Sequence, residues 1–289
     1  MINLVTISDY SYLLKGLTLY ESISKKTKDF VLHYLCIDKN SFELLKKFES
    51  ETLKVYSSEE LTKSDETLNL LSLTNYKYFC WCLASYFTNW LIGRINSPVC
   101  YVDSDIFFYQ DLNLLYKEFG DCDVGIFRHR QFTLDKNYPE GWFNVGVVYF
   151  NNSERGKSIL EWWADAVKFR KYPQLATCGD QKYLDEFPKL TNKILIDGNI
   201  GHGAPWQWHI YQFTDDGNII WEGKEQELIF THFSQFQDNG ETYIPSTMHY
   251  IYTPLQSYKT NIHLKKLYDD YHHEIKKVKE KYIQNGPQR

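Results

Sequence analysis

Residues 98–112 read PVCYVDSDIFFYQDL, an apolar segment that two carboxylates interrupt before it becomes apolar again. Side chains two positions apart on a strand point the same way, so Asp103 and Asp105 are expected to bring two negative charges together. Like charges repel in a partly dry site, and a divalent cation such as magnesium, manganese or calcium would relieve that repulsion. The alternative is an ordinary turn after a strand, where Asp forms local hydrogen bonds. The segment alone leaves both interpretations open.

The segments around this motif alternate between strand-like and helix-like patterns. In the first half, strands are expected at 3–7, 30–38, 52–57 and 98–102, and helices at 12–26, 41–50 and about 74–94. In the more mixed second half, strands are expected at 121–127, 143–151, 193–198 and 227–233, and a helix at 158–169. Strands that alternate with helices predict βαβ units and a mainly parallel sheet. Ligands of such sheets bind beyond the carboxyl ends of the strands, which is where the two aspartates lie.

The composition predicts one α/β domain with a basic tail. The chain has 289 residues, 43% of them hydrophobic, which is enough for a sizeable core. Its formal charge of -5 argues against general affinity for nucleic acid. Residues 255–289 hold eight Lys or Arg against four Asp or Glu, so this tail carries +4 and the remainder -9. We expect the α/β domain to span residues 1–254 and a helical tail to span 255–289.

The cysteines and the N-terminus predict a cytoplasmic protein. The cysteines are Cys36, Cys80, Cys82, Cys100, Cys122 and Cys178. They form no CxxC pair, so free buried thiols in a reducing cytosol are expected rather than zinc ribbons or redox dithiols. The first residues, MINLVTISDYSYLL, lack the basic region and long apolar stretch of a signal peptide. No apolar segment approaches the ~20 residues that a membrane span needs.

Asp180 and Gln181 stand at an apparent helix start, in the stretch CGDQKYLDEFP at 178–188. Asp is a favoured N-cap because its carboxylate accepts backbone N–H groups, and this is the plainer interpretation. The Gln181 amide beside it adds a second hydrogen-bonding side chain. A carboxylate and an amide at one helix N-terminus could also form hydrogen bonds with sugar hydroxyls.

Other positions have both a structural and a functional interpretation. Asn144 and Gly146 lie in a strand of bulky residues, where a Gly marks either packing or the close approach of a ligand. His232 follows an apolar strand, where an imidazole is either a structural residue or a third ligand for a metal held by two carboxylates. Trp206 and Trp208 either stack on a sugar ring or fill the core.

These motifs occur in one order: a strand-end Asp-x-Asp, an Asn-x-Gly strand, a Gly-Asp-Gln helix and a late strand ending in His-Phe. Together they resemble the nucleotide-sugar glycosyltransferases of the GT-A fold. The resemblance is closest to glycosyltransferase family 8, the class of glycogenins and lipopolysaccharide galactosyltransferases, and to related bacterial surface-polysaccharide enzymes with a YLDADLFFF-like stretch. Here that stretch reads YVDSDIFFY, and the N-terminal TISDYSYLLKGLTLYESI is similar to the family's nucleotide-binding start. The resemblance covers residues 3 to about 258.

The resemblance implies a metal site and a nucleotide site. Asp103 and Asp105 match the pair that holds a manganese or magnesium ion on the donor diphosphate, and His232 matches the distant third ligand. The nucleotide-binding positions implied are Thr6, Asp9, Tyr12, Asp103, Ser104 and Asp105, with Tyr12 a candidate to stack on the base.

The resemblance also implies a donor-sugar wall. The matching positions are Lys77, Asn144, Gly146, Asp180 and Gln181, and the last two are the candidate catalytic residues. Trp206 and Trp208 are the weaker candidates for the acceptor. Relatives often carry an Arg on the helix before the Asp-x-Asp strand, whereas this helix offers Lys77, with Arg94 nearer its end.

The implied activity is the metal-dependent transfer of a hexose-type sugar from a nucleotide-diphosphate sugar, most simply a UDP-sugar. The acceptor would be a glycan or lipid-linked glycan in surface polysaccharide synthesis, and the anomeric configuration would be retained. A haloacid-dehalogenase-type phosphatase is one alternative, since Gly179, Asp180 and Asp185 would mimic its later motif. Its Asp-x-Asp pair usually lies on the first strand, however, and here a hundred residues precede Asp103. A catalytically silent nucleotide-sugar-binding protein is the other alternative.

The tail SYKTNIHLKKLYDDYHHEIKKVKEKYI, at 257–283, predicts an amphipathic helix. Its apolar positions at three- and four-residue spacing are Ile262, Leu264, Leu267, Tyr268, Tyr271, Ile275 and Val278. We favour a helix that packs this face on the domain. The alternative is peripheral contact with the inner face of an anionic membrane, where a lipid-linked acceptor would lie. The basic residues for that contact are Lys276, Lys277, Lys279 and Lys281.

Overall fold

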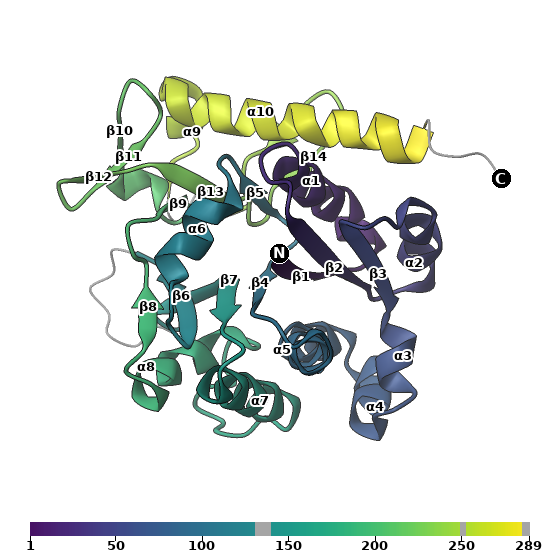
Figure 1. Cartoon of the computed structure of the whole chain (residues 1–289). Helices are drawn as coiled ribbons and strands as arrows, with labels where there is room; N and C mark the ends of the chain where they lie inside the picture. The colour runs from purple at the N-terminus through teal and green to yellow at the C-terminus, as the bar shows by residue number, and fades with distance from the viewer. Residues whose placement is uncertain (131–139, 249–252, 285–289) are drawn as a thin grey trace.

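The computed structural model describes residues 1–130, 140–248 and 253–284. Its centre is a seven-stranded sheet in the order β3-β2-β1-β4-β7-β6-β8 (Figure 1). The strands are β1 Ile2–Ser8, β2 Phe30–Cys36, β3 Leu53–Ser57, β4 Val99–Val102, β6 Val124–Arg128, β7 Phe143–Phe150 and β8 Ile194–Ile196. Neighbouring strands are parallel except where β7 pairs with β4 and with β6. The prediction of a mixed, mainly parallel α/β sheet is therefore confirmed.

Helices cover both faces of this sheet, which explains why β2 is buried at every position. One face packs against α1 (Leu13–Ser24), α2 (Lys39–Leu45) and α6 (Leu112–Phe119). The other face packs against α5 (Tyr76–Ile95) and α7 (Glu154–Lys168). Shorter helices are α3 Ser58–Thr62, α4 Glu66–Thr74 and α8 Phe187–Leu190. The result is a three-layer arrangement with a cluster of buried side chains on each side of the sheet.

A second, three-stranded sheet stands beside the carboxyl end of β4. Its strands are β5 Ile106–Phe108, β13 Leu228–His232 and β9 Gly201–Gly203, in the order β5-β13-β9. Residues 106–108 were not among the strands expected from the sequence. They form a strand because β13 offers them an antiparallel partner. The remaining short strands are β10 Gln212–Phe213, β11 Ile219–Trp221, β12 Lys224–Gln226, β14 Gln237–Asp238 and β15 Tyr243–Ile244.

The C-terminal segment forms α9 (Ser257–Thr260) and α10 (Ile262–Lys279), followed by a π-helical turn, η5 (Glu280–Gln284). Figure 1 shows α10, in yellow, lying across one side of the molecule next to α1. Its buried side chains are Leu264, Tyr268, Tyr271, His272, Ile275 and Val278. Two predicted members of the apolar face differ, since Ile262 is 75% exposed and Leu267 is half-buried. Residues 285–289 of the predicted tail lie outside the described residues.

None of the helices in the described part of the chain combines the length and the apolar character that a bilayer crossing needs. All six cysteines lie in that part and are free thiols. Four of them are buried, and Cys80 and Cys178 are half-buried.

Candidate functional site

The two aspartates lie where β4 leaves the central sheet. The backbone N–H of Asp103 donates to the carbonyl of Gly146 on β7 at 2.9 Å. A turn closed by the Ile106 N–H and the Asp103 carbonyl, at 3.1 Å, leads into β5. The Asp105 carbonyl then accepts the N–H of Phe233, at the end of β13, at 2.9 Å. Backbone bonds to two neighbouring strands therefore hold both carboxylates in place at the sheet edge.

His232, the last residue of β13, joins the two aspartates. Its Nε2 lies 3.0 Å from Asp105 Oδ1 and 3.7 Å from Asp103 Oδ2. One ligand atom from each of the three residues lies within 4.8 Å of the others. The Tyr101 hydroxyl donates to the second oxygen of Asp103 at 2.8 Å. The structure thus brings the three predicted metal ligands together, and two carboxylates with an imidazole suit manganese or magnesium.

The charges in this cluster also fit a divalent cation. Burial raises the pKa of Asp103, and the neighbouring Asp105 carboxylate adds to this rise. Burial acts in the same direction on Asp105, but His232 and Lys15 outweigh it and hold the pKa of Asp105 at about 2. Burial would lower the pKa of His232, yet the two carboxylates raise it. Two crowded carboxylates that draw positive charge toward them are the electrostatic setting of a metal site.

Lys15, on α1, is a cation of the site that sequence analysis did not single out. Its Nζ lies 3.9 Å from Asp105 Oδ2 and 4.1 Å from the centre of the Tyr12 ring. Burial lowers the pKa of Lys15, and Asp105 opposes that effect. The sequence feature that could have identified it is a lysine between the buried residues Leu13 and Gly16, at a position where an amphipathic helix usually has an apolar residue of its core face.

The two cations of α5 that sequence analysis named, Lys77 and Arg94, lie at different distances from the site. The Lys77 Nζ stands 4.9 Å over the Trp81 ring and lines a cleft beside the aspartates. Arg94 is exposed and packs on Trp90 near the other end of the helix. Of these two, only Lys77 is near the site.

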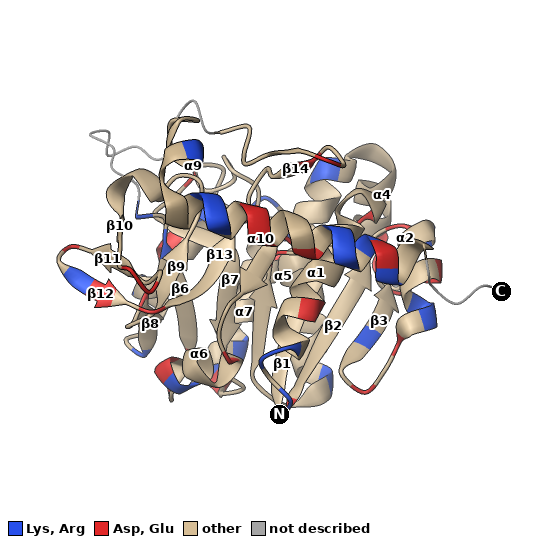
Figure 2. Cartoon of the chain, turned by 90° about the horizontal axis from the view of Figure 1, so that it is seen from above, with Lys and Arg blue, Asp and Glu red and all other residues tan. Residues whose placement is uncertain are grey.

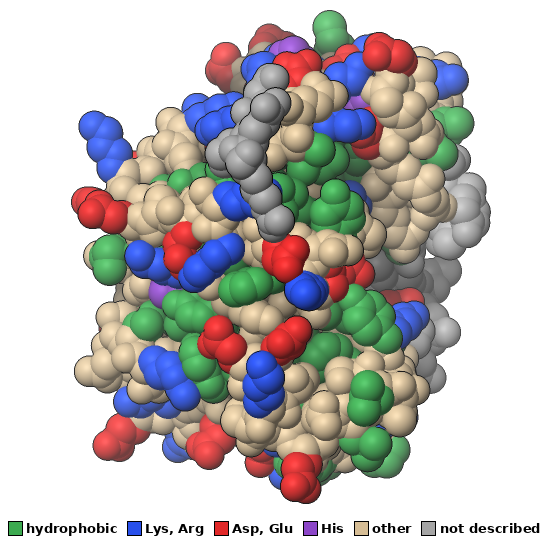
Figure 3. Space-filling view, turned by 90° about the vertical axis from the view of Figure 1, so that its right-hand side faces the viewer, with side chains coloured by type: hydrophobic (Ala, Val, Ile, Leu, Met, Phe, Trp, Pro, Cys, Tyr) green, Lys and Arg blue, Asp and Glu red, His purple; other side chains and the backbone are tan. Residues whose placement is uncertain are grey.

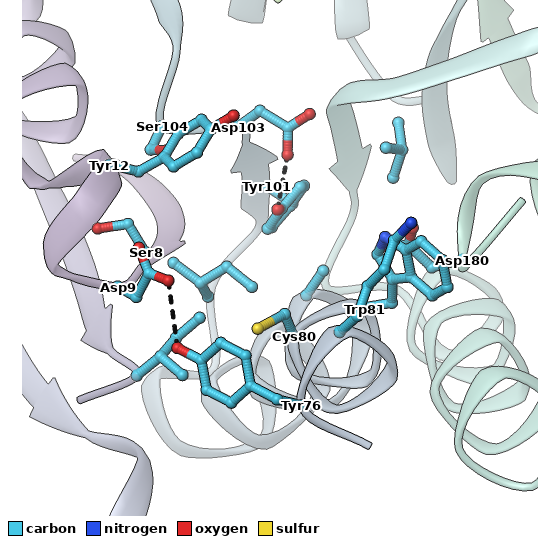
Figure 4. A pocket seen from close by; sticks show the side chains of 15 residues that line it. Ser8, Asp9, Tyr12, Tyr76, Cys80, Trp81, Tyr101, Asp103, Ser104 and Asp180 are labelled. Carbon is cyan, nitrogen blue, oxygen red and sulfur yellow. Dashed lines mark hydrogen bonds between the residues drawn. The ribbon is translucent and has the colours of Figure 1, made fainter. Parts of the chain in front are cut away.

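A cleft of about 520 Å³ opens between the turn after β1 and helix α5 (Figure 4). The residues predicted from the sequence that line it are Asp9, Tyr12, Lys77, Asp103, Ser104 and Asp180. Asp9 accepts the Ser11 N–H at 3.0 Å and so caps the short helix η1 (Tyr10–Tyr12). Its other oxygen accepts the Tyr76 hydroxyl at 3.2 Å, which joins the two walls of the cleft. Thr6 is fully buried within β1 and lines neither this cleft nor the next.

Helix α5 supplies a wall that the sequence analysis missed. Tyr76, Cys80 and Trp81 all point toward the cleft in Figure 4, and Ala84 continues the same face. Tyr76, Cys80 and Ala84 recur every four residues and Trp81 adjoins Cys80, so they lie on one helix face. That signal was hidden because α5 is apolar on all sides.

A second cleft, of about 430 Å³, lies on the other side of Asp103. The predicted residues in its lining are Tyr12, Asp103, Ser104, Asp105, Asn144, Gln181, Trp206 and His232. Trp206 is buried with its ring at 81° to that of His232, and its indole N–H has no hydrogen-bond partner among the described residues. Trp208 instead packs in the core, where its Nε1 donates to the Tyr268 hydroxyl at 3.2 Å. Glu140 also lines this cleft and was not predicted.

Asp180 lines the first cleft and stands at the N-cap position of the next helix without making a capping hydrogen bond. The segment after it is a 3-10 helix, η3 (Gln181–Glu186), and no capping bond from Asp180 forms, so the capping interpretation is wrong. Burial and the nearby Asp103 raise the pKa of Asp180 to about 8. Gly179 before it has φ +59°, and a Cβ there would lie 2.6 Å from the Trp81 ring. Only glycine permits this turn against Trp81.

Comparison with solved structures shows that the chain has the GT-A glycosyltransferase fold. It superimposes on the galactosyltransferase LgtC in complex with donor and acceptor sugar analogs, with a TM-score of 0.52, 14% identity and coverage of 80% of this chain and 86% of LgtC. It also superimposes on mouse xyloside xylosyltransferase 1, with a TM-score of 0.50, 16% identity and coverage of 84% and 99% of the two chains. At these identities the likeness concerns the fold.

Two relatives by sequence come from Bacillus subtilis strain 168. The uncharacterized protein YfnF is 26% identical over 252 residues, which cover 80% of each chain. The uncharacterized protein YfnD is 25% identical over 241 residues, which cover 80% of this chain and 76% of YfnD. No family model matches the sequence.

Proposed function

We propose that this protein is a metal-dependent glycosyltransferase that moves a hexose-type sugar from a nucleotide-diphosphate sugar, with UDP as the favoured nucleotide. The observation that carries the proposal is the cluster of Asp103, Asp105 and His232 in a GT-A fold, in which all three line the second cleft and Asp103 also lines the first. Tyr12, Trp81, Asp103 and Ser104 line both clefts. A nucleoside in the first cleft and the donor sugar where the two clefts meet would bring the diphosphate between them to the three ligands.

The first cleft offers what a nucleoside needs. Tyr12 has an exposed ring that can stack on a base, and the aliphatic side chains of Ile7 and Ile37 line the same space. Asp9 accepts three hydrogen bonds and keeps one lone pair, on Oδ2, for a polar edge of the nucleoside. None of these side chains distinguishes strongly between bases, so the choice of UDP rests on the resemblance to family 8.

The chemistry proposed is departure of a nucleoside diphosphate. Asp103, Asp105 and His232 would hold a manganese or magnesium ion, which supplies Lewis-acid stabilisation of the charge on the leaving group. Lys15 lies next to Asp105 and offers the diphosphate a second, fixed positive charge. Asp180, Lys77 and the wall around Gly146 lie where the donor sugar would be held.

For the acceptor we propose a glycan or lipid-linked glycan of a surface polysaccharide, bound in the second cleft. Trp206 lines this cleft and supports the proposal, because an aromatic ring can stack on a sugar ring. The resemblance to family 8 supports retention of the anomeric configuration, while Glu140 is the carboxylate that would serve as base in an inverting reaction. Proton NMR of the fresh product decides between them, since an anomeric coupling opposite to that of the donor contradicts retention.

Turnover with a panel of nucleotide sugars and a generic phosphomonoester, each with and without Mn²⁺, tests the function. We expect sugar transfer or slow donor hydrolysis that needs the metal, and no phosphomonoester cleavage. Cleavage of the phosphomonoester would favour the phosphatase alternative, for which the position of Asp103 after β4 gives no support. Nucleotide-sugar binding with neither transfer nor hydrolysis would favour a catalytically silent binding protein.

A further inference from the structure

The side-chain amide of Asn144, on β7, meets four polar groups beside the metal cluster. Its Oδ1 lies 2.9 Å from the backbone N of Gly146 and 3.1 Å from Nδ1 of His232. Its Nδ2 lies 3.0 Å from Oε1 of Gln181 and 3.4 Å from Nε2 of His129. An amide has two lone pairs on oxygen and two N–H groups, so these contacts use its whole hydrogen-bonding capacity.

Backbone groups fix which way this amide points. The N–H of Gly146 can only donate, so the atom that faces it is the oxygen of Asn144. Gln181 is fixed in the same manner, because its Oε1 accepts the Val145 N–H at 3.2 Å and its Nε2 donates to the Glu140 carbonyl at 3.0 Å. The Gln181 oxygen therefore faces the Asn144 N–H group.

His129 supplies the fourth partner. Its Nδ1 donates to the Gly141 carbonyl at 3.0 Å, since a carbonyl can only accept. Burial lowers the pKa of His129 to about 4, so near neutral pH its Nε2 is an unprotonated acceptor. Both hydrogens of the Asn144 amide thus have acceptors, and its oxygen is left to face His232.

We propose that Asn144 is a positioning residue that holds His232 in the tautomer needed for metal binding, and that Gln181 and His129 lock Asn144 in place. Because Asn144 presents an oxygen, the His232 ring carries a proton on Nδ1. Its Nε2, which faces both aspartates, is then the nitrogen that binds the ion. Hydrogen bonds of this kind fix the orientation of metal-binding histidines. The inference rests on the proposed function, and it assigns the amides of Asn144 and Gln181 to the metal site rather than to the donor sugar.

Gly146 is part of the same arrangement around His232. A Cβ at this position would lie 2.6 Å from Asn144 Oδ1 and 2.7 Å from His232 Nδ1. A side chain there would enter the hydrogen bond between these two atoms. The absence of a side chain in this otherwise bulky strand therefore permits the contact between Asn144 and His232.

The test is the Mn²⁺ affinity of the full chain in saturating UDP, measured from the electron paramagnetic resonance signal of free Mn²⁺. We expect Asn144→Ala and Gly146→Ala each to weaken Mn²⁺ binding by about 10- to 100-fold, and Gln181→Met by about tenfold. Gln226→Met is the matched control, because Gln226 is a buried amide bonded to Arg130 that lines neither cleft.

Nitrogen NMR of histidine-labelled protein with Mg²⁺ and UDP adds a direct readout. We expect the His232 ring to carry its proton on Nδ1, and a ring protonated only on Nε2 overturns the inference. Equal Mn²⁺ affinities of the wild type and all three weakening variants overturn it as well, while leaving the proposed function intact. A wild type that binds no Mn²⁺ overturns the proposed function and this inference with it. If Asn144→Ala shows no unfolding transition without metal, the Gly146 and Gln181 variants decide.

Discussion

Lys15 is the residue whose placement most changes the view of the site. It lies between the Tyr12 ring and Asp105, with a side chain only 13% exposed, at the point where the proposed diphosphate would meet the metal ligands. Lys77 lies in the first cleft over Trp81. We therefore predict that Lys15 contacts the diphosphate of the donor molecule and that Lys77 contacts its sugar.

We expect Lys15→Met to weaken UDP binding in saturating Mn²⁺ by about 10- to 100-fold, because a hydrogen bond to a charged group contributes roughly 1.5–3 kcal/mol. Lys77→Met should affect a UDP-sugar more than UDP, since its assigned partner is the sugar. Titration calorimetry of both ligands against both variants gives the four values. A Lys15→Met protein that binds UDP like the wild type would remove Lys15 from the diphosphate site.

His232 makes metal binding depend on pH. The carboxylates of Asp105 and Asp103 raise the pKa of His232 despite its burial, and a metal must displace the proton from its Nε2. Mn²⁺ affinity should therefore rise with pH, by at most about tenfold per unit, and level off above the raised pKa. Titrations from about pH 6 to pH 8.5 measure this, and an affinity that falls over that range contradicts the assignment.

The stability of the metal-free protein should change with pH in the opposite direction and fall as the pH rises. Its protonated His232 pairs with Asp105, so this stabilisation is complete below the usual pKa of 6.5. It is lost as the pH rises through the raised pKa of the folded state. Thermal unfolding in a chelator separates the two effects.

At the scale of elements, α10 supports the strand that carries His232. The Tyr271 ring stacks on Phe233, the residue after His232, with centroids 3.8 Å apart and 3° between the planes. Tyr271 is 1% exposed, and its hydroxyl has no hydrogen-bond partner among the described residues. The helix contributes ring packing here rather than a polar contact.

We expect Tyr271→Ala to lower the free energy of unfolding by about 3–5 kcal/mol, as large aromatic truncations in cores do. Tyr271→Phe should lie within about 1 kcal/mol of the wild type or be more stable, because it removes only an unpaired hydroxyl. Denaturant unfolding of the metal-free protein compares the two. Equal losses in both variants would mean that the hydroxyl has a role in the fold.

The larger elements were predictable from local signals, and the smaller ones were not. Strands β1 to β4 and helices α1 and α5 have apolar patterns long enough to identify from the sequence alone. Helices α3 and α4 were missed, although Ser57 and Asp65 cap them and both residue types are favoured at N-caps. Strand β5 has three residues and exists through its pairing with β13, more than a hundred residues later. No local pattern reports such a partner.

Some residues of the candidate site were likewise predictable from the sequence, and others were not. Asp103, Asp105 and His232 were candidates because each stands at the end of an apolar strand. They come together because β5, which follows the aspartates directly, pairs with β13 of the second sheet. The contacts of Lys15 with Asp105 and of Asn144 with His232 join residues about 90 positions apart. Their chemistry was visible in the sequence, but their pairing depends on how the elements pack. The same packing removes Trp208 and Thr6 from the cleft linings.

At the scale of the whole molecule, Figures 2 and 3 show no large patch of one charge among the described residues on the sides that they present. Acidic and basic side chains alternate on the face over β3 and helices α2 to α4 (Figure 3). They also alternate along α10 (Figure 2). Three of the tail lysines proposed for membrane contact lie next to carboxylates: Lys276 beside Glu241, Lys277 beside Glu274 and Lys281 beside Glu21.

We therefore expect peripheral contact of the tail with the inner face of a membrane, if it is part of the function, to be weak. Co-sedimentation of the full chain with anionic vesicles should be slight at low salt and vanish at high salt, because screening removes exposed charge attraction. Binding that persists at high salt would show an apolar contact that the packed face of α10 does not provide.

The central claim is that the Asp103, Asp105 and His232 cluster joins a metal to a nucleotide diphosphate. Calorimetric titration of UDP into the wild type, with Mn²⁺ and with a chelator, tests it most directly. Asp105→Ala is the test variant, and Asp121→Ala, an exposed aspartate whose side chain is 96% accessible, is the matched control. We predict tight UDP binding that requires Mn²⁺ in the wild type and the control and is lost in Asp105→Ala. UDP binding of equal strength in a chelator, or unchanged binding by Asp105→Ala, would contradict the claim.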